Sequence, residues 1–153
     1  MLSEGDAAPD FTLPRDGGGT VTLSALRPGK AVLYFYPKDD TPGCTTEALD
    51  FTRLAGQFRD AGALVIGISK DSVKAHDRFC RKHGLGVILA SDEDGDTCER
   101  YGVWGEKKLY GKSFMGIERS TFLIDGAGKV ARVWPKVKVA GHAEEVLAAA
   151  RGS

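Results

Sequence analysis

The chain carries no net charge and no long hydrophobic run. Lys and Arg together number 21, as do Asp and Glu, so no overall field attracts nucleic acid or an anionic membrane surface. Apolar runs such as residues 31–36 are far shorter than the roughly 20 residues of a membrane-spanning helix. The first residues also lack the basic start and apolar stretch of a signal peptide. We therefore expect a cytoplasmic protein that binds neither nucleic acid nor membranes.

The chain has only three cysteines, which is an odd number. Three cysteines cannot all pair within one chain, which excludes a fully paired disulfide framework. In a reducing compartment, three free thiols buried as small apolar residues are the ordinary expectation. What matters is whether Cys44, Cys80 or Cys98 lies where a thiolate would be stabilised.

The pattern of apolar residues predicts a single α/β domain over residues 1–153. Early strands alternate with helices, which favours parallel pairing, whereas a tight turn between the last two strands favours antiparallel pairing. We therefore expect a thioredoxin-like fold, with a mixed central sheet, helices on both faces and an N-terminal β-hairpin. The expected elements, in chain order, are a hairpin over 10–23, a strand over 31–36, a helix over 42–62, a strand over 63–69, a helix over 72–83, a strand over 87–90, a short helix over 95–101, strands over 121–124 and 130–134, and a helix over 141–151.

A helix is predicted to begin shortly after the strand over residues 31–36. Thr41 suits the N-cap of this helix, and Pro42 suits its first position. Cys44 then falls in the first turn, where unpaired N–H groups and the positive end of the helix dipole favour a thiolate. Gly43 allows a ligand to approach the backbone closely. This setting suits a reactive sulfur that attacks an oxygen-bearing substrate.

The ordinary alternative is that Cys44 is only the first apolar residue of an inward helical face. It is spaced at helical intervals with Ala48 and Phe51, as core residues would be. Asp39 and Asp40 would oppose a thiolate if they pointed inward, and we expect both on the solvated side of the loop. A compensating cation is required, and sequence distance alone does not select it among the 21 available.

Residues 37–44 carry the pattern PxxxTxxC, which resembles the signature of the peroxiredoxins, thiol peroxidases built on a thioredoxin fold. The longer string around it resembles the bacterioferritin comigratory protein branch, also called peroxiredoxin Q. Four separated motifs in the right order make this resemblance specific, and it covers nearly the whole chain. The similar segments are residues 5–11, 35–47, 101–112 and 116–125.

This resemblance implies a peroxidase in which Cys44 is the peroxidatic cysteine. Its thiolate would attack one peroxide oxygen, giving a sulfenic acid and releasing water or an alcohol. Thr41 would hydrogen-bond the attacked oxygen, and backbone N–H groups near Gly43 would hold the peroxide. Pro37 would shield the sulfenic acid from bulk water.

The resemblance also names the missing cation. Arg119 would stabilise the thiolate and bind a peroxide oxygen with its fixed fork of donors. Glu47 would orient Arg119 through an ion pair. Taken alone, Arg119 could be a surface arginine before a strand, and Glu47 could simply complement the helix dipole.

The resolving cysteine is less defined. Many members of this branch carry it five residues after the peroxidatic one, but that position here is Leu49. Another subset places it on the following helix, where Cys80 matches. The alternatives are a one-cysteine enzyme reduced directly by an external thiol, or resolution by Cys98. A Cys44–Cys80 disulfide requires Cα atoms roughly 4.4–6.8 Å apart, so we expect local unwinding near both residues on oxidation.

The sequence offers several other functions. A metal site at His76, Cys80 and His83 would span about 10 Å of one helix, too far for all three to reach a single ion, although two of them with an outside ligand could bind one. A dithiol oxidoreductase would require C-x-x-C, which Cys44 does not begin. A Cys-His hydrolase lacks any supporting signature, and a non-catalytic binding module remains the plain alternative. Glycines between residues 102 and 113 do not complete a P-loop and are expected to form turns around the active site.

We therefore expect no cofactor and no metal. The resemblance implies hydrogen peroxide and small organic hydroperoxides as substrates. It further implies thioredoxin or a similar dithiol as reductant, and a monomer.

Overall fold

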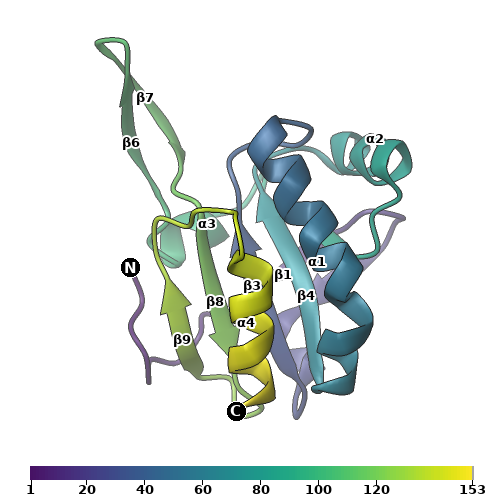
Figure 1. The fold of residues 1–153 in the computed structure, drawn as a ribbon. Helices are drawn as coiled ribbons and strands as arrows, with labels where there is room; N and C mark the ends of the chain where they lie inside the picture. Colours follow the sequence, from purple (N-terminus) through teal and green to yellow (C-terminus); the bar gives the residue numbers. More distant parts are fainter. Residues whose placement is uncertain (153) are drawn as a thin grey trace.

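The computed structural model describes residues 1–152 and is built around a five-stranded mixed sheet (Figure 1). The strands lie in the order β5-β4-β3-β8-β9. The first three pair in parallel and the last two antiparallel, as the connections predicted. Their bounds are β3 Lys30–Phe35, β4 Ala63–Ser69, β5 Ile88–Ser91, β8 Ser120–Ile124 and β9 Val130–Trp134.

Helices lie on both faces of this sheet, but unequally. The connections β3–α1–β4 and β4–α2–β5 both step toward the same edge of the sheet. Because such connections are right-handed, α1 and α2 lie on one face of the sheet, and α4 lies on the same face. The opposite face is covered by the short helix α3, a 3-10 turn η1 and the N-terminal hairpin β1–β2. The bounds are α1 Pro42–Asp60, α2 Val73–His83, α3 Thr97–Arg100, α4 His142–Arg151, η1 Leu23–Leu26, β1 Thr12–Pro14 and β2 Thr20–Thr22.

Burial on both sides explains the composition of the central strand β3. Its successive side chains point to opposite faces, so Val32 and Tyr34 join the core beneath α1, while Leu33 and Phe35 join the core on the other side. Since both layers are apolar, β3 reads as a continuous hydrophobic run. Within residues 1–152 no helix combines the length and apolar character needed to cross a membrane.

A second hairpin, β6 (Trp104–Leu109) with β7 (Lys112–Ile117), projects away from the body of the molecule (Figure 1). The sequence predicted only turns here, so this part of the prediction was wrong. Most of both strands is exposed, and the alternating apolar pattern that marks a half-buried strand is therefore absent. The local signal lies in the two-residue turn, where Tyr110 (φ 52°) and Gly111 (φ 76°) both adopt positive φ.

The two helices that carry the cysteines of interest begin differently. Thr41 occupies the N-cap of α1 with extended backbone, but its side chain does not cap the helix. Ser72 does cap α2, where its hydroxyl accepts a hydrogen bond from the Ala75 N–H. Gly84 ends α2 in the left-handed conformation at φ 64°, as its position predicted.

Candidate active site

Cys44 is the third residue of α1 and is only 1% exposed. The loop after β3 places it at the carboxyl end of the central strand. The first N–H groups of a helix have no intrahelical acceptor, and the positive end of the helix dipole adds to their effect. The Cys44 sulfur therefore lies buried at the positive end of the α1 dipole.

Arg119 donates a hydrogen bond from Nη2 to the Cys44 Sγ at 3.3 Å. The two residues are 75 positions apart in the chain, and the sheet brings them together. Strand β8 runs antiparallel to β3 with Ser120 opposite Phe35, so the residue before β8 lies beside the end of β3. The Arg119 side chain is 17% exposed, which limits solvent screening of its charge.

Gly43 provides the space in which the Arg119 guanidinium lies. A Cβ at position 43 would be 3.2 Å from Arg119 Nη2, closer than ordinary van der Waals contact. Glycine therefore allows the guanidinium to approach the start of α1 and reach the sulfur.

Glu47 lies one turn after Cys44 and fixes the other side of the guanidinium. Its Oε1 accepts a hydrogen bond from Arg119 Nη1 at 2.6 Å, and the residue is 1% exposed. Burial raises the pKa of Glu47 to about 7, against the opposing effect of the Arg119 charge. Because Oε2 has no partner within the described residues, this carboxylate is poorly compensated.

The free energy of unfolding should depend on pH through Glu47. The unfolded chain releases this proton near pH 4.5 and the folded protein near 7, so the unfolded state binds fewer protons in between. The free energy of unfolding should therefore fall by up to about 3 kcal/mol as the pH rises through this interval, because the proton that stabilises the folded state is lost. Glu47→Gln should remove this loss. Urea unfolding on both sides of the interval measures the effect, and the exposed Glu93→Gln is the control. Parallel stability curves for Glu47→Gln and the unmodified protein would contradict the assignment.

Two other predicted residues of the motif take no part in this group of contacts. The Thr41 hydroxyl donates to the Lys38 carbonyl oxygen at 2.8 Å. Pro37 is exposed at the start of the same loop. The structure thus joins Gly43, Cys44, Glu47 and Arg119 directly and leaves Thr41 and Pro37 at the edge.

Cys80 lies late in α2 and is half-buried, as its helical phase predicted. It packs against the same apolar core as Cys44, on the same face of the sheet. Burial raises the pKa of the Cys80 thiol to about 12, and the carboxylates of Asp16 and Asp39 add to the effect. Both thiols are free.

Cys98 is the second residue of α3 and is buried in the core on the opposite face of the sheet. Burial and the nearby Asp92 raise the pKa of its thiol. The Asp92 carboxylate also accepts the Cys98 backbone N–H at 2.8 Å. The central sheet therefore separates Cys98 from Cys44.

The expectation that Asp39 lies on the solvated side of the loop was wrong. Its side chain is 6% exposed and bonds to Nδ1 of the fully buried His76 at 2.6 Å. Asp40, in contrast, is 40% exposed and faces Lys82 and His83 of α2. The two histidines considered as metal ligands, His76 and His83, thus bond to carboxylates. Within residues 1–152 no group of three candidate metal ligands converges.

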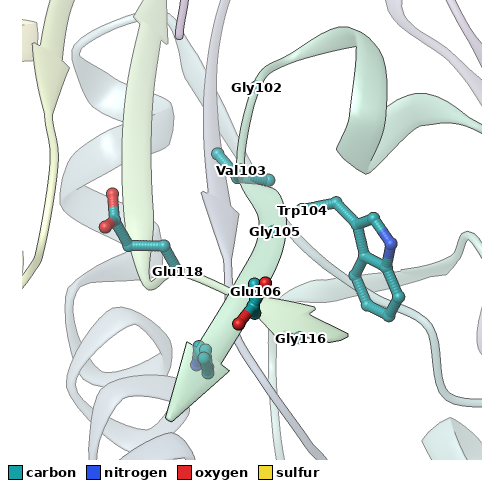
Figure 2. Close-up of a pocket in the computed structure, with 8 residues that line it drawn as sticks. Gly102, Val103, Trp104, Gly105, Glu106, Gly116 and Glu118 are labelled. Carbon is teal, nitrogen blue, oxygen red and sulfur yellow. The ribbon is translucent and has the colours of Figure 1, made fainter. Parts of the chain in front are cut away.

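Sequence reasoning also missed Lys107, because it missed the hairpin that carries it. Lys107 is half-buried, and its stem passes over Gly116, where a Cβ would meet Lys107 Cδ at 3.2 Å. It lines a hollow of about 170 Å³ at the hairpin base, from which Glu118 and Trp104 extend in opposite directions (Figure 2). Burial lowers the pKa of Lys107, as does the charge of Arg119. Lys107 is therefore a second cation near the Arg119 site.

Comparisons with known proteins match this fold and its motifs. The AhpC/TSA family matches over residues 4–133. Peroxiredoxin Bcp of Xanthomonas campestris is 54% identical over 140 residues, which cover 92% of this chain and 88% of that relative. Peroxiredoxin Bcp of Bacillus subtilis is 49% identical over 143 residues, covering 94% and 91%. A solved structure of Xanthomonas campestris bacterioferritin comigratory protein, described for its alkyl peroxide reduction activity, superimposes with a TM-score of 0.90 at 49% identity and covers 99% and 97%.

The chain belongs to the AhpC/TSA family, and it is therefore a peroxiredoxin, an oxidoreductase of the thiol peroxidase class. Within that family, its relatives place it in the bacterioferritin comigratory protein branch, also called peroxiredoxin Q. The thioredoxin-like fold and the family expected from the sequence are both confirmed.

Proposed function

We propose that the protein reduces hydrogen peroxide and small organic hydroperoxides at Cys44. The thiolate attacks one peroxide oxygen, the O–O bond breaks, and a sulfur–oxygen bond forms. The sulfur becomes a sulfenic acid, and the leaving oxygen takes a proton and departs as water or an alcohol. The hydrogen bond from Arg119 to the buried Cys44 sulfur, at the start of α1, carries this proposal.

The surrounding groups would hold the peroxide and its developing charge. Arg119 would bind a peroxide oxygen while Glu47 keeps the guanidinium oriented. Backbone N–H groups near Gly43 would bind the same oxygen. The Thr41 hydroxyl would turn from the Lys38 carbonyl to the attacked oxygen. Pro37, at the rim, would limit the access of water to the sulfenic acid.

Cys80 would resolve the sulfenic acid as an intramolecular disulfide. Its thiolate would attack the Cys44 sulfur, the sulfur–oxygen bond would break, and the leaving hydroxide would take up a proton and depart as water. The folded environment of Cys80 favours the thiol over the thiolate, so α2 and the start of α1 would open locally before this step. Thioredoxin, or a similar dithiol, would then reduce the disulfide of a monomeric enzyme.

Rapid mixing of the reduced protein with hydrogen peroxide tests the first step. Thiol counting should show fast loss of one thiol, and a sulfenic acid trap should locate the product on Cys44. Tryptophan fluorescence from Trp104 and Trp134 provides a continuous signal. If no thiol reacts faster than a free cysteine in solution, the proposed function is wrong.

Cys80→Ser should separate the two steps. The variant should lose its first thiol at a rate within about twofold of the unmodified protein, because Cys80 takes no part in the attack. Turnover with thioredoxin should fall at least about tenfold, because no intramolecular disulfide forms. The control is Cys98→Ser, which removes a thiol from the other face of the sheet. Unchanged turnover of Cys80→Ser would instead support a one-cysteine enzyme reduced directly by an external thiol.

A further inference from the structure

The loop that carries Asp39 and Asp40, just before α1, is joined to α2 by charged side chains. Asp39 Oδ2 lies 2.6 Å from His76 Nδ1. Asp40 bonds through Oδ2 to Lys82 Nζ at 2.7 Å and through Oδ1 to His83 Nε2 at 2.8 Å. The loop that leads into the Cys44 helix is thus bonded to the Cys80 helix at two points about two turns apart.

The Asp39–His76 pair is the buried part of this connection. Both ring nitrogens of His76 face oxygen acceptors, because Nε2 lies 3.1 Å from the Ala90 carbonyl oxygen. Burial lowers the pKa of His76, but the hydrogen bond and charge of Asp39 and the Ala90 carbonyl outweigh it and raise that pKa, so these contacts favour the protonated ring. Asp39 in turn accepts from the Tyr36 hydroxyl at 2.6 Å, and its N–H donates to Asp71 at 2.9 Å. Loss of one partner from such a pair leaves a buried charge uncompensated.

The cleft at the same junction is lined mostly by charged side chains. It has a volume of about 300 Å³ and lies between the loop and α2. Phe79 is the one large apolar side chain that lines it. The lining residues are Lys38, Asp39, Asp40, Asp71, Ala75, Arg78, Phe79 and Lys82. The bonds from Asp39 and Asp40 therefore attach the two segments directly across this polar cleft.

We propose that these bonds form a latch, so that the loop before α1 (the Cys44 loop) and the Cys80 helix α2 open together. The latch consists of Asp39 with His76, and of Asp40 with Lys82 and His83. It rests on the proposed Cys44–Cys80 disulfide and adds the residues that control when this disulfide forms. While closed, the latch holds Cys44 in the arrangement that reacts with peroxide. Movement of either segment breaks the same contacts, so each opening favours the other.

A latch of this kind affects the two steps of the reaction differently. Attack on peroxide requires the closed site, because Arg119 and the start of α1 must stay in place. Disulfide formation, as proposed above, takes place in the open state, in which the Cα atoms of Cys44 and Cys80 can come within about 6.8 Å of each other. A weaker latch should therefore speed resolution. It should also leave less sulfenic acid for a second peroxide to oxidise to the sulfinic acid.

Two variants test the latch at different depths. Asp39→Asn removes the charge opposite His76 and keeps the shape of the side chain. Asp40→Asn removes the negative charge that pairs with Lys82 and His83, and asparagine tolerates the left-handed backbone that Asp40 adopts at φ 59°. Because Asp40 is 40% exposed, this second variant should fold even if the first does not. Arg53→Gln is the matched control, since Arg53 joins α1 to Glu144 of α4 and not to α2.

Amide exchange of the reduced protein, without peroxide, gives the first measurement. Exchange over residues 37–42 and 76–84 should rise about tenfold or more in Asp39→Asn, and less in Asp40→Asn. After a single turnover with peroxide, disulfide formation should accelerate by a similar factor, with less sulfinic acid at high peroxide. Arg53→Gln should change neither.

Faster exchange in only one of the two segments would overturn the coupling. Faster exchange with an unchanged rate of disulfide formation would show that the latch does not control resolution. Since exchange is measured without peroxide, failure of the proposed peroxidase reaction would leave this first result intact. The two failures are thus distinguishable.

Discussion

Replacing Cys44 with serine is expected to lower the rate of peroxide reduction at least about a thousandfold. A serine hydroxyl keeps the size of the thiol and its place beside Arg119, but it is a far weaker nucleophile at neutral pH. The rate of hydrogen peroxide consumption with excess dithiol reductant measures the effect. Amide exchange or thermal unfolding should show that the serine variant remains folded.

The matched control for this prediction is Cys98→Ser. Cys98 is as deeply buried as Cys44, but it lies on the opposite face of the sheet without a neighbouring arginine bond to its sulfur. Peroxide consumption by this variant should stay close to that of the unmodified protein. If Cys44→Ser retained most of the activity while Cys98→Ser lost it, the active thiol would have been assigned wrongly.

Arg119→Met should lower the rate of the first step about a hundredfold to a thousandfold. The change removes the donor 3.3 Å from the Cys44 sulfur and the cation that favours the thiolate. It also leaves Glu47 buried without its partner, which should raise the pKa of this carboxyl above about 7. Stopped-flow measurement of thiol loss as a function of peroxide concentration gives the rate.

Arg119→Lys sharpens this test. Lysine keeps the charge, but its single ammonium lacks the fork that lets Nη1 reach Glu47 while Nη2 reaches Cys44. We expect partial recovery, between the rates of the methionine variant and the unmodified protein. Arg132→Met is the control, because Arg132 on β9 stacks over Trp134 away from the sulfur. Full activity of Arg119→Met would show that another cation, such as Lys107, stabilises the thiolate.

The order of elements was predictable because each core element carries its own periodic signal. The strand over 63–69 and the helix beginning at Pro42 appear where the apolar spacing placed them. The hairpin β6–β7 was missed because its strands bury little on either face. Lys107 was missed with the hairpin, because its position near the site depends on the register of β6 against β7. No local sequence pattern specifies that register.

The candidate site was predictable only in part. Helix position alone made Cys44 a candidate, and the resemblance supplied Arg119 and Glu47, which the structure places against it. Asp39 was misplaced because the loop sequence gives no sign of the buried histidine that it meets. Its partner lies 37 residues away, and such a distance is closed by the fold and not by local propensity.

The sequence by itself determined the thioredoxin-like order of strands and helices, the family, and the cysteine at the start of a helix. These follow from local patterns, namely hydrophobic period, turn and cap residues, and a short motif read in order along the chain. Only the tertiary structure decided which charges surround each thiol. It placed Arg119 beside Cys44, separated Cys98 from it by the sheet, and bonded the Cys44 loop to α2 through Asp39 and Asp40. The electrostatic field at a buried sulfur depends on distance in space, and packing of the sheet sets those distances.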